Sequence, residues 1–89
     1  MSDTTFISDE IRARLVLGEY DPYQFFVATL LLMVSAPKSD LDVQSHLSKV
    51  LSDTIDRCGF DQSTVQQAED EVIALFAEHG IAMERLREW

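Results

Sequence analysis

Residues 25–34 read FFVATLLLMV, and every residue in this stretch except Thr29 is apolar. The stretch belongs to a chain of 89 residues with a formal net charge of −9. A helix with an ordinary amphipathic face leaves polar residues on its other side, whereas this stretch has apolar residues on every side. We therefore predict that residues 25–34 form a helix at the centre of the fold, covered by neighbouring helices or by another molecule.

The residues on either side of this stretch set the limits of the central helix. Asp21 precedes Pro22, which combines a side-chain acceptor for the first free N–H groups with a proline at the first helical position. At the other end, Pro37 disfavours helical geometry at Ala36. The sequence thus predicts a helix over residues 22–35.

Similar signals predict further helices. A short helix over 8–18 begins with Ser8 as its cap, and residues 1–7 are expected to be frayed. The third helix begins with Ser39 as its cap, assisted by Asp42. An apolar stripe continues from there to Cys58, where Gly59 provides a left-handed stop.

The fourth helix is capped by Asp61 or Ser63 and ends before Gly80, and residues 82–89 are predicted to form a short fifth helix. We expect the third and fourth helices to pack on the central helix as an antiparallel pair. The fold class that follows is all-α, with four to five short helices around a central hydrophobic helix. At 89 residues, we expect one domain over 1–89.

The charge balance bears on the partners of this chain. Sixteen acidic residues against seven basic ones disfavour binding to nucleic acid or to an anionic membrane, since both need clustered Lys and Arg. A protein with a basic or apolar surface is the expected partner. The C-terminal third carries the predicted acidic surface, namely Glu69, Asp70, Glu71 and Glu78.

Three further observations predict a cytoplasmic protein. The chain has a single cysteine, which suits a reducing compartment. Its first residues lack the basic and apolar regions of a secretory signal. The apolar stretch 25–34 is also too short to span a bilayer as a helix.

The residues that usually carry chemistry are few. His46 follows Asp42 by one turn, but two ligands leave a zinc site half built. His79 and Cys58 lie on predicted apolar stripes, so we expect a structural role for His79 and burial for Cys58. We predict no catalytic residue, no metal site and no cofactor, and therefore no enzyme.

The aromatic and apolar residues around the second helix are the candidates for function. Their simplest interpretation is that they form the core. The alternative is that the short neighbouring helices do not enclose the central helix completely, which leaves a strip for a partner or a second subunit to bury. The predicted interface residues are Tyr20, Tyr23, Phe26, Leu30 and Met33.

From these observations we predict a small acidic protein–protein interaction module. It would act as an adaptor, an inhibitor, an immunity protein or an assembly chaperone, and would form a homo-oligomer or a hetero-complex. Two alternatives stay open. One is a nucleic-acid mimic that inhibits a DNA-binding protein, as a net charge of −9 suggests. The other is a non-catalytic subunit of a larger enzyme complex.

Overall fold

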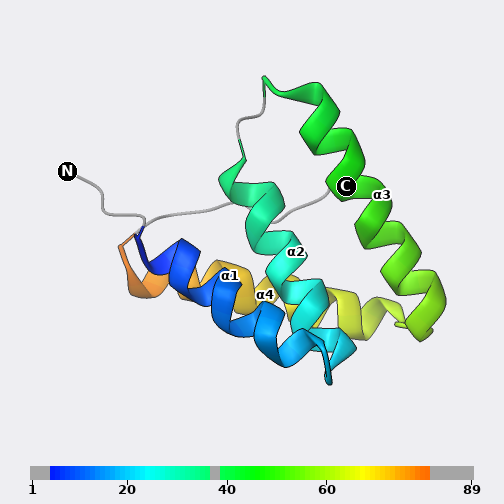
Figure 1. The fold of residues 1–89 in the computed structure, drawn as a ribbon. Helices are drawn as coiled ribbons and strands as arrows, with labels where there is room; N and C mark the ends of the chain where they lie inside the picture. The colour runs from blue at the N-terminus through cyan, green and yellow to red at the C-terminus, as the bar shows by residue number, and fades with distance from the viewer. Residues whose placement is uncertain (1–4, 37–38, 81–89) are drawn as a thin grey trace.

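The structure is a computed structural model that describes residues 5–36 and 39–80. All secondary structure in these two ranges is helical, which confirms the all-α fold class. The described ranges form four helices, whose arrangement is drawn in Figure 1. They are α1 Thr5–Gly18, α2 Pro22–Ser35, α3 Leu41–Cys58 and α4 Gln62–Glu78. The predicted fifth helix over 82–89 lies outside the described residues.

Each of the last three helices begins with an aspartate cap. The Asp21 carboxylate accepts a hydrogen bond from the Tyr23 N–H at 3.0 Å, which confirms the predicted start of α2. Asp61 caps α4 by accepting from the N–H and the hydroxyl of Thr64, both at 2.8 Å. These two hydrogen bonds stabilise the carboxylate form, and they hold the pKa of Asp61 below its ordinary value.

Two predicted helix starts were wrong. The cap of α3 is Asp40, whose carboxylate accepts from the Val43 N–H at 3.3 Å, and Ser39 lies one residue outside. In α1, Ser8 is an exposed residue inside the helix, which already begins at Thr5. Ile7 is only 7% exposed, so burying this side chain holds the first turn in place and residues 5–7 are not frayed.

The glycine stop of α3 agrees with its prediction. Gly59 has a φ of 66°, in the left-handed region that glycine adopts without strain. The Phe60 N–H donates to the Ile55 carbonyl oxygen at 3.1 Å, and the Phe60 ring packs against the core. The chain therefore turns directly from α3 into α4.

Helix α2 is the centre of the fold, as predicted. It packs against each of the other three helices, and its residues 26–31 are all buried. Thr29, the one polar residue of the run, donates its hydroxyl hydrogen to the Phe25 carbonyl oxygen at 2.9 Å. The core cluster draws on all four helices, and comprises Ile7, Phe26, Val27, Leu30, Leu31, Leu51, Ala68, Val72 and Phe76.

The partner of α4 is not the predicted one. Helices α3 and α4 each pack on α2 rather than on each other, and α1 and α4 run side by side in opposite directions (Figure 1). The rings of Phe6 and Phe76 meet edge to face at 5.8 Å, and Arg14 lies 3.8 Å from Glu71. These contacts give α4 a neighbour in α1, which explains why the expected antiparallel pair of α3 and α4 is absent from the part of the chain described.

Candidate protein-interaction surface

The larger of two exposed apolar areas in the described ranges lies on α1. Ala13, Val16 and Leu17 follow the spacing of one helix face, and all three are exposed, Val16 at 62% and Leu17 at 53%. Tyr20, at 86% exposure, lies in the following turn, where its N–H donates to the Leu17 carbonyl oxygen at 2.8 Å. We refer to these four residues as the outer face of α1.

The opposite side of α1 is fixed against the core, which sets the direction of the outer face. Ile7 belongs to the core cluster and Ile11 packs against it. At the end of the helix, Gly18 lies so close to α2 that an added Cβ would be 2.9 Å from the Phe25 Cβ. Because α1 is held along its whole inner side, Val16 and Leu17 cannot turn inward without displacing these contacts.

A second, smaller apolar area lies at the start of α3. Leu41 is 75% exposed and Val43 is 39% exposed. These residues follow the end of α2, whereas the outer face of α1 precedes its beginning, and a helix of 14 residues is roughly 20 Å long. Figure 1 shows the end of α1 and the start of α3 at opposite ends of α2. The two areas are separate surfaces, and Leu41 is a useful control position for experiments on the outer face of α1.

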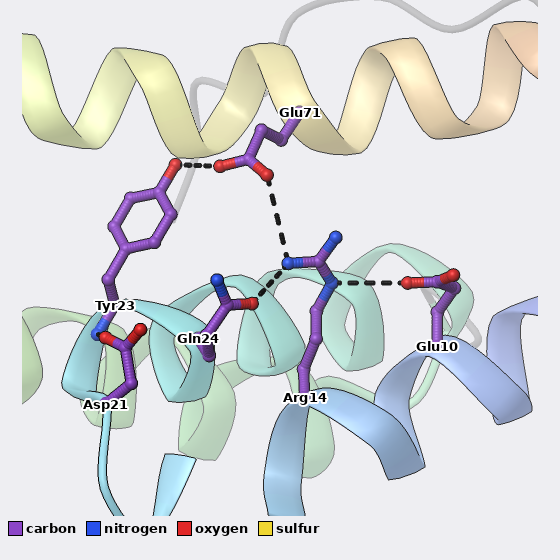
Figure 2. A network of polar contacts seen from close by, with 6 residues as sticks. All are labelled: Glu10, Arg14, Asp21, Tyr23, Gln24 and Glu71. Carbon is purple, nitrogen blue, oxygen red and sulfur yellow. Dashed lines mark hydrogen bonds and ion pairs between the residues drawn. The ribbon is translucent and has the colours of Figure 1, made fainter. Parts of the chain in front are cut away.

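A polar network between side chains of α1, α2 and α4 holds these three helices together (Figure 2). The Tyr23 hydroxyl donates a hydrogen bond to Glu71 Oε2. Arg14 Nη1 lies 3.8 Å from Glu71 Oε1 and donates to Gln24 Oε1, while Arg14 Nε lies 3.4 Å from Glu10 Oε2. Each charged group in this network faces an opposite charge or a hydrogen-bond partner, so its role is to position the helices.

The network changes the acidity of its tyrosine. Burial disfavours the charged tyrosinate and raises the pKa of Tyr23 well above its ordinary value, and the hydrogen bond to Glu71 adds to this effect. Tyr23 therefore stays protonated and acts as a hydrogen-bond donor. It is not poised to lose a proton, which a role as a general base would require.

The five predicted interface residues separate into different environments. Phe26 and Leu30 are 0% exposed, so their assignment to an interface was wrong: the single chain already encloses them. Met33 is half-buried and packs against the core cluster. Tyr23 is half-buried in the polar network, and only Tyr20 lies openly on the surface.

The predicted acidic surface is also only partly present. Glu69 is 7% exposed, because it shares the inward side of α4 with Val72 and Phe76, so its assignment to the surface was wrong. Glu71 faces Tyr23 and Arg14. Asp70 and Glu78 are exposed as predicted.

The residues considered for chemistry lie apart from one another. His46 is exposed on α3, and His79 stacks on Phe6 with the ring centroids 3.7 Å apart. Cys58 is exposed, so its predicted burial was wrong. At this end of α3, Phe60 packs against the core in place of Cys58, directly after the turn at Gly59.

Residues 5–36 and 39–80 hold no group of three or more His, Cys, Asp or Glu side chains placed to bind a metal ion. None of the helices in these ranges is long and apolar enough to cross a bilayer.

The sequence reasoning missed three residues of the outer face of α1, namely Ala13, Val16 and Leu17. The available signal was the run of three apolar residues at 15–17, which spans more of a helix than one buried face can cover.

Comparison of the chain with protein-family models, with curated proteins and with solved structures found no match. The function proposed below therefore rests on the geometry of the chain itself.

Proposed function

We propose that this protein is a small acidic protein–protein interaction module whose contact surface is the outer face of α1. The single observation that supports this proposal is the exposure of Val16, Leu17 and Tyr20 on a helix whose other side is already packed. Exposed apolar side chains that cluster on one face are typical of surfaces that another protein covers. Tyrosine is enriched in such interfaces, since its ring packs while its hydroxyl stays hydrated.

The distribution of charge suits a division of roles between two helices. Helix α1 carries two acidic and two basic residues, whereas α4 carries four acidic residues and no basic one. An uncharged apolar surface supplies binding energy, while exposed carboxylates such as Asp70 and Glu78 speed the encounter with a basic partner. The proposed module therefore contacts its partner through α1, and α4 contributes to the rate of association.

The alternative of a nucleic-acid mimic has less support. Mimicry of a phosphate backbone needs closely spaced, accessible carboxylates. On α4, the most acidic helix, Glu69 is buried and Glu71 is engaged by Tyr23 and Arg14. We therefore propose the interaction module and not the mimic.

Site-specific photo-cross-linking in cells tests the proposed surface. A benzophenone amino acid replaces Val16 in one variant and Leu41 in a matched control, since both are exposed apolar residues on different helices. We expect a covalent adduct with a protein from position 16 and a much weaker one from position 41. Absence of an adduct at position 16, or equal adducts at both positions, would contradict the proposal.

A further inference from the structure

We infer that the outer face of α1 binds a second copy of this chain, with the two α1 helices antiparallel about a two-fold axis near Val16. This inference rests on the proposed function, because it names the partner of the surface proposed above. It is carried by two properties of the exposed residues: the order of small and large side chains along the face, and the order of the charges beside it.

The side chains of the outer face are complementary to themselves when one copy is reversed. A two-fold axis at Val16 places residue 12 of each copy opposite residue 20 of the other and residue 13 opposite residue 19. Tyr20 then lies one residue, about 1.5 Å along the helix, from the position opposite Ala13, and the small side chain of Ala13 leaves room for the Tyr20 ring, which is 86% exposed. Val16 meets its own counterpart at the centre, with Leu17 of each copy beside it, and both are removed from water.

The charges beside the outer face select the antiparallel arrangement. Arg12 and Glu19 are both exposed, and neither forms an ion pair with any other residue in the described ranges. In the antiparallel pair, Arg12 of each copy lies one residue from the position opposite Glu19 of the other, a distance that the long arginine side chain spans, which gives two equivalent ion pairs. A parallel pair would place Arg12 against Arg12, and like charges at that position oppose association.

Net charge explains why two copies meet at α1 rather than elsewhere. Each chain carries −9, so two copies repel each other over most of their surfaces. Helix α1 is the exception among the exposed helices, because its acidic residues Asp9 and Glu10 are balanced by Arg12 and Arg14. Helix α3 has three acidic residues against two basic ones, and α4 has four against none.

Sedimentation equilibrium at physiological salt tests the inference with charge reversal. The proteins are the full chain, Arg12→Glu, Glu19→Arg and the double variant that carries both changes. We expect a reversible monomer–dimer equilibrium for the full chain. Each single variant places like charges together twice per dimer and should weaken association by about fivefold or more. The double variant restores opposite charges and should return to within about twofold of the full chain.

Two further variants make the result specific to α1. Val16→Asp should abolish the dimer, whereas Leu41→Asp, which adds the same charge at another exposed apolar residue, should leave it intact. Circular dichroism checks that all variants stay folded, as expected for exposed positions. A full chain that stays monomeric at millimolar concentration, or a double variant no better than the single ones, would overturn the inference.

The outcomes also separate this inference from the proposed function. A monomeric chain that still cross-links to a different protein through position 16 would overturn the dimer and leave the contact surface in place. A dimer that is indifferent to Val16→Asp, in a chain that gives no adduct from position 16, would contradict both.

Discussion

The Tyr23 hydroxyl donates a hydrogen bond to Glu71 across 48 residues of sequence, and this contact joins α2 to α4. Glu71 also faces Arg14 of α1, so one carboxylate links three helices (Figure 2). The network holds α1 in a fixed orientation, with its inner side on the core and its outer face in water. The orientation of the outer face of α1 thus depends on a polar contact between residues that are far apart in the chain.

Removing the Tyr23 hydroxyl should destabilise the fold. Tyr23→Phe keeps the ring but leaves Glu71 without its donor, and we expect the free energy of unfolding to fall by about 1 to 2 kcal/mol. Urea denaturation measures this change. The matched control is Tyr20→Phe, because the exposed Tyr20 hydroxyl has no such partner among the described residues. Equal stability of the two variants would show that the Tyr23 hydrogen bond contributes nothing.

The raised pKa of Tyr23 predicts a loss of stability at alkaline pH. The folded chain holds the Tyr23 proton to a higher pH than the unfolded chain does, so above the ordinary tyrosine pKa near 10 the folded state binds more protons. The free energy of unfolding should therefore decrease as pH rises beyond that value. Absorbance of tyrosinate should show a step well above pH 10 that is missing in Tyr23→Phe. A wild-type titration complete by pH 10 would exclude the raised pKa.

Local signals explain which parts of the fold could be predicted from sequence. Asp21 with Pro22 defines the start of α2, and Gly59 defines the end of α3, through interactions within a few residues of each position. The continuous apolar run at 25–34 likewise identifies the central segment, since an element that is apolar on every side is kept from water only where other elements cover it.

Tertiary contacts explain what could not be predicted. The pairing of α1 with α4 depends on Phe6 meeting Phe76 and on Arg14 meeting Glu71, and no pattern within one helix encodes these partners. Glu69 was placed on the surface because it is charged, although its spacing from Val72 puts it on the inward side. The apolar run at 15–17 indicates that part of α1 stays exposed, but which of its residues form the outer face follows only from the contacts of its inner side.

Leu30 provides the test that separates core from interface. It is 0% exposed, so Leu30→Ala should remove packing that the single chain supplies and should lower the free energy of unfolding by about 2 to 5 kcal/mol. Leu41→Ala makes the same change at 75% exposure and should alter stability by less than about 0.5 kcal/mol. Chemical denaturation of both variants at low protein concentration gives the comparison. Similar small losses in the two variants would mean that Leu30 is not enclosed.

Gly18 should be intolerant of even one added methyl group. An alanine Cβ there would come within 2.9 Å of the Phe25 Cβ and 3.1 Å of its Cα, so α1 and α2 would have to separate. We expect Gly18→Ala to lower the free energy of unfolding by about 1 to 3 kcal/mol, although alanine favours helix. Ser8→Ala, at an exposed position of the same helix, is the control and should cost little. A Gly18→Ala variant as stable as the wild type would refute the close approach.

Backbone nuclear magnetic resonance at micromolar and millimolar protein concentration tests most directly whether the outer face of α1 is the contact surface. On concentration, amide shift changes should gather at residues 12–20 and leave the exposed start of α3, at Leu41 and Val43, unchanged. The same changes should be missing in Val16→Asp. Shift changes centred on α3, or spectra that do not depend on concentration, would contradict self-association through α1.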